Sequence, residues 1–297
     1  MKNSQKSVSQ KIKERIISRS ENYEFWLYLI RQSALAKVGI FLTFFVIITA
    51  ILAPYITPDP LSQNLDESLA IPSLDHFFGT DRLGRDVFSR VIHGSRISLT
   101  LGIIAVAISI IVGTLVGLGS GYIGGKVDEF LMRVTDLFLA FPPLVMEMAI
   151  AAALGPSLEN IMIAVSVRWW PRYARLIRSS VLSVKQNLFV EAAKASGQRG
   201  IHTVFRHILP NSISPIVVQS TLDLGLIINV AAALGFLGMG AQPPTPEWGT
   251  MINEARNVML YQWWLAFFPG VFLFITVVGL NLIGDWLNDC MNPKLVR

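Results

Sequence analysis

Apolar runs of bilayer-spanning length are the feature that most restricts what this chain can fold into. A helix that crosses the hydrocarbon core of a bilayer needs about 20 predominantly apolar residues. Hydrophobic residues make up 52% of the 297-residue chain. Six segments reach or approach spanning length: 35–56, 97–120, 130–153, 158–178, 213–239 and 263–286. The sequence therefore predicts an all-α membrane protein with six transmembrane helices.

The distribution of lysine and arginine predicts how these helices are oriented. Short cytoplasmic segments of membrane proteins carry an excess of both residues. Residues 1–33 hold seven of them, and residues 168–211 hold eight against the single acid Glu191. Six spans place both segments on one side, so we expect the two chain ends in the cytoplasm. The arginine-containing segment 80–96 is the exception, and we place it outside because nearby aspartates offset its charge.

Small and charged residues inside the spans suggest internal contacts. Gly113 and Gly117 have the GxxxG spacing that lets membrane helices approach closely, so we expect the second span to pack against protein. Glu147 lies deep in the third span, and Asp223 lies in the fifth with Asn229. Charge in a span usually faces protein or water. These three residues are candidates for a translocation path, or equally for satisfied interhelical hydrogen bonds.

The sequence contains no convincing nucleotide-binding, metal-binding or catalytic motif. Gly119–Gly124 matches GxGxxG by letter, but these glycines end an apolar run and do not join a strand to a helix. The four histidines lack metal-ligand spacing, and Cys290 is the only cysteine. The basic residues lie between apolar runs, which fits membrane orientation better than nucleic-acid binding. We expect no catalytic residue, no metal and no cofactor in this chain.

The polar segment 189–211 has a pattern of its own. Ala192, Ala193 and Ala195 give a short helix a smooth face, and Gly197 can adopt the positive φ that ends a helix. A second helix is predicted by apolar residues at i, i+3, i+4 and i+7, which are Ile201, Val204, Phe205 and Ile208. Pro210 disfavours helix at Leu209. We predict a pair of helices under the membrane, which docks on a partner or rests on lipid headgroups.

This segment resembles the EAA loop of ABC importer permeases, because it holds Glu191-Ala192-Ala193, then Gly197, and then Leu209-Pro210. Four further stretches, at 78–90, 124–142, 232–251 and 284–295, resemble the C-type permease of the dipeptide/oligopeptide/nickel importer family. The resemblance covers nearly everything from about residue 22 onward. His207 departs from the isoleucine that many members carry there.

This resemblance implies a type I ABC importer permease fold and a set of partners. They are a homologous second permease subunit, two ATPase subunits that hold ATP and Mg, an extracytoplasmic substrate-binding protein and the lipid bilayer. Glu191, Ala192, Ala193, Ala195, Gly197, Leu209 and Pro210 would form the ATPase-coupling segment. The implied organisation is a cytoplasmic segment 1–34, a first transmembrane helix 35–56, an extracytoplasmic loop 57–96, a core permease domain 97–287 and a cytoplasmic tail 288–297. Within the core, five helices surround a coupling loop at 180–211.

The implied function is the import of peptides across the cell membrane, with this chain forming half of the pathway. Members of the family differ in cargo, so nickel chelates and oligosaccharides stay as alternatives. A secondary transporter or channel that works alone is a third hypothesis. The sequence shows no internal repeat of the kind that many such transporters have.

Overall fold

The computed structural model describes Ile30 and residues 33–198 and 200–291; the predictions for residues 1–32 lie outside them, apart from Ile30. Every regular element in the described residues is a helix, and the single β-bridge joins Thr80 to Asp86. Within the described part of the chain, four helices are long and apolar enough to cross a membrane: α2 (Ala34–Ile56), α3 (Val87–Ile123), α10 (Ser214–Phe236) and α12 (Trp264–Met291). The prediction of an all-helical chain with several apolar spans is confirmed for this part of the chain.

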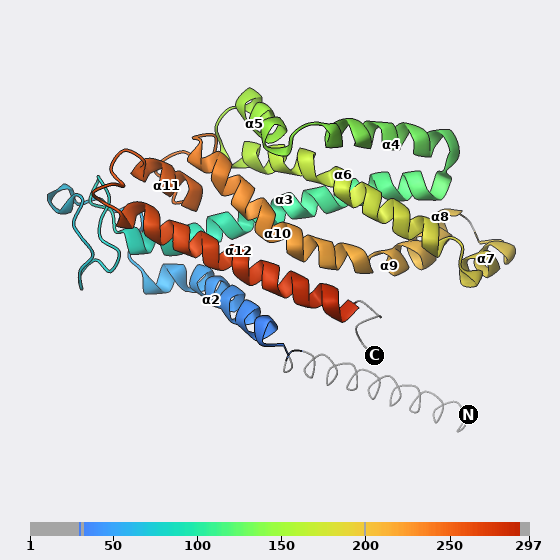
Figure 1. Ribbon diagram of the computed structural model, residues 1–297, viewed down its shortest axis with the longest axis horizontal. Helices are drawn as coiled ribbons and strands as arrows, with labels where there is room; N and C mark the ends of the chain where they lie inside the picture. The colour runs from blue at the N-terminus through green and yellow to red at the C-terminus, as the bar shows by residue number, and fades with distance from the viewer. Residues whose placement is uncertain (1–29, 31–32, 199, 292–297) are drawn as a thin grey trace, which may run out of the picture.

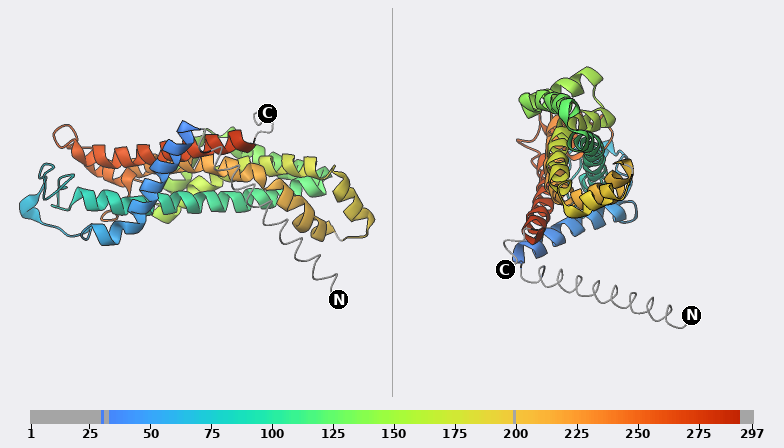
Figure 2. Two further views of the ribbon diagram at one scale, coloured as in Figure 1. Left: turned by 90° about the horizontal axis from the view of Figure 1, so that it is seen from below. Right: turned by 90° about the vertical axis from the view of Figure 1, so that its right-hand side faces the viewer.

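The long helices form an elongated bundle. In Figures 1 and 2, α3, α6 (Leu158–Val184), α10 and α12 run along the long axis, and α2 crosses beside them. One end carries α7 (Leu188–Ala195) and α8 (Gly200–Thr203), and the opposite end carries α11 (Trp248–Ala255) and the segment 57–86. We call these the α7 end and the α11 end. α2 begins, and α12 ends, on the side of the α7 end.

The segment predicted as the third span consists of two helices. α4 (Gly125–Ala140) and α5 (Pro143–Leu154) meet at an angle of 92°. Phe141, Pro142 and Pro143 lie at the break. Proline lacks the backbone N–H that continues a helix, and its ring disfavours helix at the residue before it. Two successive prolines therefore explain why 130–153 is not one straight helix.

Several helix ends differ from the predicted ones, and α6 (Leu158–Val184) continues into the coupling loop predicted at 180–211. α3 starts at Val87, inside the segment 57–96 predicted as a loop, because the Asp86 carboxylate caps it by accepting a hydrogen bond from the Ser89 N–H at 2.7 Å. α12 continues to Met291, so residues 288–291 are helical and do not belong to a separate tail. Residues 292–297 lie outside the described residues.

Glycines on α3 allow it to pack closely against α6. A Cβ atom added at Gly117 would lie 2.5 Å from the carbonyl oxygen of Ala174, and one at Gly113 would lie 2.5 Å from Cβ of Tyr173. Gly121, one turn further, would meet Val181. The expected packing of the second span against protein is confirmed.

Replacing Gly117 with alanine is expected to destabilise the chain by about 1–3 kcal/mol, because the added methyl group must push two packed backbones apart. Gly119 of the same helix is a matched control, since a Cβ there meets only Leu131 Cδ1, at 3.6 Å. Thermal unfolding in detergent, followed by tryptophan fluorescence, measures both variants. Equal unfolding temperatures for the two variants would show that close approach of α3 and α6 is not required.

Candidate functional site

The α7 end presents a short helix that ends as the sequence predicts. Gly197 has φ +78, and the Ser196 and Gln198 N–H groups donate to the carbonyl oxygens of Ala192 and Ala193. A positive φ is costly for residues with a Cβ, so glycine suits this position. A side chain at Gly197 would meet nothing within 4 Å. The turn therefore points into open space.

The surface around this turn mixes small and apolar side chains. Glu191, Ala192, Ala195 and Gly197 are exposed, as expected for a smooth face, whereas Ala193 is buried and packs inward. Three large apolar side chains, Leu188, Ile201 and Phe205, are more than half exposed. We call these seven exposed residues the α7 surface: Leu188, Glu191, Ala192, Ala195, Gly197, Ile201 and Phe205.

The second predicted helix is irregular. It runs from α8 through a π-helical turn at Val204–Ile208 into α9 (Leu209–Ser212). Only Val204 and Ile208 of the predicted apolar face are buried. Leu209 is helical, so the expectation that Pro210 disfavours helix there is not met. Pro210 lies in the first turn of α9, where the missing N–H is tolerated.

Glu147 is almost completely buried on α5, with 1% of its surface exposed. The Trp169 Nε1–H of α6 donates a hydrogen bond to Oε1 at 3.2 Å. The other carboxylate oxygen of Glu147 accepts no hydrogen bond from a described residue. An interhelical hydrogen bond therefore satisfies one oxygen and leaves the second available.

Asp223 is fully buried on α10 and pairs with Arg172 of α6, whose Nη1 lies 3.2 Å from Oδ1. The Gln219 side chain also donates to this oxygen, at 2.9 Å. Asn229, which the sequence groups with Asp223, is exposed and takes no part in this cluster. The sequence analysis missed Arg172, although α6 carries Arg168, Arg172 and Arg175 at the i, i+4 and i+7 positions of one helix face.

These arginines give α6 a polar face. The side chains of Arg172 and Arg175 are 42% and 54% exposed, and Arg175 lies 2.6 Å from Asp136 of α4. Arg172, Arg175, Leu139, Leu176 and Gln219 line an open cavity of about 390 Å³. Exposed charge within a membrane span usually faces other protein or water, because exposure to lipid is costly.

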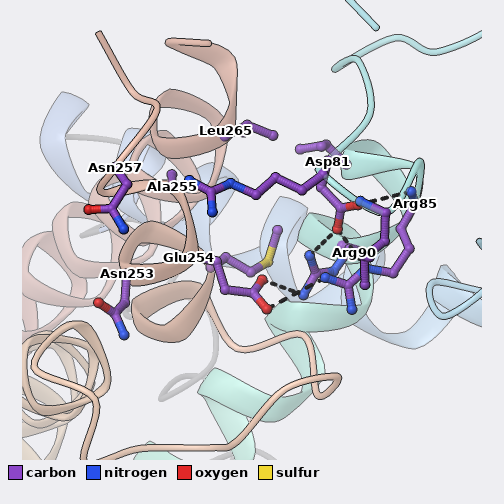
Figure 3. Close-up of a pocket in the computed structure, with 12 residues that line it drawn as sticks. Asp81, Arg85, Arg90, Asn253, Glu254, Ala255, Asn257 and Leu265 are labelled. Carbon is purple, nitrogen blue, oxygen red and sulfur yellow. Dashed lines mark hydrogen bonds and ion pairs between the residues drawn. The ribbon is translucent and has the colours of Figure 1, made fainter. Parts of the chain in front are cut away.

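A second group of charges lies at the α11 end. Asp81 and Glu254 are each paired with both Arg85 and Arg90, at 2.6 Å for Arg85 Nε–Asp81 Oδ2 and 2.7 Å for Arg90 Nη2–Glu254 Oε2. Arg90 is 2% exposed. Figure 3 shows this four-residue charge network joining the start of α3 to α11. In the sequence, this network is visible only as four arginines in a segment rich in aspartate. That pattern does not reveal Glu254, the partner on α11.

His76 ties the segment 65–80 to the start of α3. Its Nδ1 lies 3.0 Å from Asp86 Oδ1, and its Nε2 lies 3.2 Å from Glu67 Oε2. The hydrogen bond to Asp86 raises the pKa of His76 above its usual value; Glu67 adds to the effect, and burial opposes it. Together with the charge network, this contact holds the α11 end in one arrangement.

Comparison with known proteins gives consistent matches. A family model described as "binding-protein-dependent transport system inner membrane component" matches residues 109–297. The dipeptide transport system permease protein DppC of Alkalihalophilus pseudofirmus is 44% identical, over 90% of this chain and 88% of that protein. A probable D,D-dipeptide transport system permease protein of Escherichia coli is 44% identical over 90% of each chain. The glutathione transport system permease protein GsiD of Pectobacterium atrosepticum is 41% identical, over 92% of this chain and 91% of that protein.

Solved structures resemble the fold at lower sequence identity. An inward-facing form of the MetNI methionine ABC transporter matches with a TM-score of 0.55 and 18% identity, over 66% of this chain and 93% of that chain. An amino acid ABC transporter matches with a TM-score of 0.53 and 16% identity, over 67% of this chain and 92% of that chain. These likenesses concern the arrangement of the helices.

Proposed function

The chain belongs to the family of binding-protein-dependent transport system inner membrane components, and from this premise we propose that it is the permease subunit of an ATP-driven importer of short peptides. The observation that carries the proposal is similarity over about nine tenths of the chain to permeases for dipeptides, D,D-dipeptides and glutathione. Those three cargoes share a short peptide backbone. Hydrolysis of ATP is assigned to separate partner subunits.

Six spans remain our proposal for the topology. Four helices qualify by composition, and the bent pair α4–α5 supplies a fifth. α6 supplies the sixth, because its 27 residues correspond to about 40 Å of helix and it runs alongside α3. Its arginines lower its mean hydropathy, but they belong to the polar face, where Asp223 and Asp136 partner them.

The α7 surface is proposed as the contact with an ATPase subunit. It lies at one end of the elongated bundle. The first residues of α2 and the last residues of α12 are the ends of those helices that lie nearer to it. Its exposed apolar residues, beside a face of alanines, suit insertion into a groove of a soluble partner. Leu209 and Pro210 then connect this surface to α10, which would transmit its movement. The α7 end and both termini are cytoplasmic in this proposal, and the α11 end faces the substrate-binding protein.

The polar face of α6 is proposed to lie toward the second permease subunit and the translocation path. Arg172 and Arg175 are too exposed to face lipid, and they border an open cavity. Asp223 lies behind this face as the buried acidic partner of Arg172, and the buried Glu147 accepts its hydrogen bond from Trp169 of the same helix. Asn229 is exposed on α10 and stays a candidate for the path.

Transport by reconstituted complexes tests this function. Proteoliposomes containing this chain, the second permease subunit, the ATPases and the binding protein should accumulate labelled dialanine only when ATP is supplied. Omission of this chain should abolish accumulation. Uptake by this chain alone would favour a stand-alone transporter or channel. ATP-driven uptake of nickel chelates or oligosaccharides, without peptide uptake, would favour the other cargo classes.

The same assay tests the path with a matched pair of variants. Glu147→Gln removes a buried carboxylate from the proposed path, so dialanine uptake should fall. Glu159→Gln removes an exposed carboxylate from the first turn of α6 and should leave uptake unchanged. Equal uptake by the two variants would exclude Glu147 from the path.

A further inference from the structure

The α11 end contains a cavity that the importer function above does not use. Its volume is about 460 Å³, within the range of small-molecule sites. The start of α3 and the loop before it form one wall, and α11 with the start of α12 forms the other. Figure 3 shows Arg85 and Arg90 on one side and Asn253 and Asn257 on the other.

The charges along this cavity do not balance. Arg85 and Arg90 are each paired with both Asp81 and Glu254, so that the four-residue network is neutral. Arg82 also lines the cavity, is exposed, and makes no side-chain hydrogen bond or ion pair with a described residue. Three guanidiniums against two carboxylates leave one positive charge for a ligand.

Arg90, which lines the same cavity, carries a buried donor without an acceptor. Arg90 is 2% exposed, and its Nε–H finds no hydrogen-bond partner among the described residues. Leaving a buried charged donor unsatisfied is costly, and an anionic oxygen would relieve that cost. The remaining lining is partly amide, from Asn253 and Asn257, and partly apolar, from Leu83, Val87, Met251, Ala255 and Leu265.

We propose that this cavity binds a small carboxylate that carries an amide or amine and a short apolar side chain. Arg82 pairs with the carboxylate, the two asparagine amides contact the polar backbone, and the apolar wall accepts the side chain. The C-terminal residue of a short peptide and a free amino acid share this chemistry. The inference rests on the proposed function and deepens it by adding a ligand subsite at the α11 end, and the cavity is the observation that carries it.

Calorimetric titration of the full chain in nanodiscs, with no ATPase or binding protein present, tests the subsite. The probes are dialanine, dialanine amide, alanine and inorganic phosphate. Dialanine should bind, and its amide should bind about tenfold more weakly or not at all, because a charge-assisted contact is lost. Dialanine binding more tightly than alanine identifies the peptide terminus as the source, and the reverse order identifies the free amino acid.

Two arginine variants of this chain locate the binding. Arg82→Gln should lose about tenfold or more of the dialanine affinity. Arg256→Gln, at an exposed arginine that does not line the cavity, should bind as the unmodified chain does. Equal binding of dialanine and its amide, tighter binding of phosphate, equal affinities of the two variants, or no binding of either dialanine or alanine would each overturn the subsite. Because uptake is not measured, such a result leaves the importer function standing.

Discussion

Replacing Gly197 with tryptophan is expected to abolish ATP-linked uptake while the chain stays inserted at near-normal abundance. The position is exposed, and an added Cβ meets nothing within 4 Å, so the new side chain would start in open space. The indole would stand on the α7 surface, where the proposed ATPase contact requires a flush fit. Labelled dialanine uptake by reconstituted complexes gives the first readout, and co-purification of the ATPase gives the second.

Two control variants separate the effect of side-chain bulk at Gly197 from the effect of backbone strain there. Gly197 has φ +78, so any residue with a Cβ there costs about 1–2 kcal/mol. Gly197→Ala carries the same strain without the bulk and should retain most of the uptake. Gly155→Trp carries the same bulk and a φ of +90 at a half-buried glycine that is distant from α7 and whose added Cβ also meets nothing within 4 Å. Normal uptake by Gly197→Trp, or equal loss in Gly155→Trp, would contradict the coupling assignment.

Local sequence patterns predicted the parts of the fold that depend on local causes. α2 and α10 closely match the predicted spans, because a long apolar run specifies a membrane helix without help from distant residues. The end of α7 was also predictable from local sequence, because it depends on Gly197 alone. The break between α4 and α5 had an equally local signal in Pro142-Pro143, but hydropathy averaged over the segment conceals a bend.

The features that the sequence did not reveal depend on distant partners. Arg90 suggests a loop because a lone arginine is rarely buried, yet Glu254, far along the chain, makes its burial possible. In the same way, Arg172 interrupts the apolar pattern of segment 158–178, and its partner Asp223 lies on α10, far along the chain. Pairing across the bundle, and not composition, decides which charged segments are helical and buried.

The charge network at the α11 end should be the most sensitive point of the chain's stability, and Asp81→Asn tests this. Asp81 accepts hydrogen bonds from the backbone N–H groups of Leu83 and Arg85 and from both guanidiniums. The amide has nearly the same shape but lacks the negative charge, so Arg85 and Arg90 would share one carboxylate. Breaking a buried ion pair in this way costs about 3–5 kcal/mol, more than a typical point substitution.

Thermal unfolding in detergent measures that cost, and we expect the midpoint to fall on the order of 10 °C. Asp75→Asn is the matched control, because Asp75 lies in the same segment, is exposed and has no ion-pair partner among the described residues. Its midpoint should stay within the error of the measurement. A double replacement, Asp81→Asn with Arg85→Met, leaves Arg90 with Glu254 and should recover part of the loss. Equal midpoints for Asp81→Asn and Asp75→Asn would mean that hydration, and not the carboxylate, balances the two buried guanidiniums.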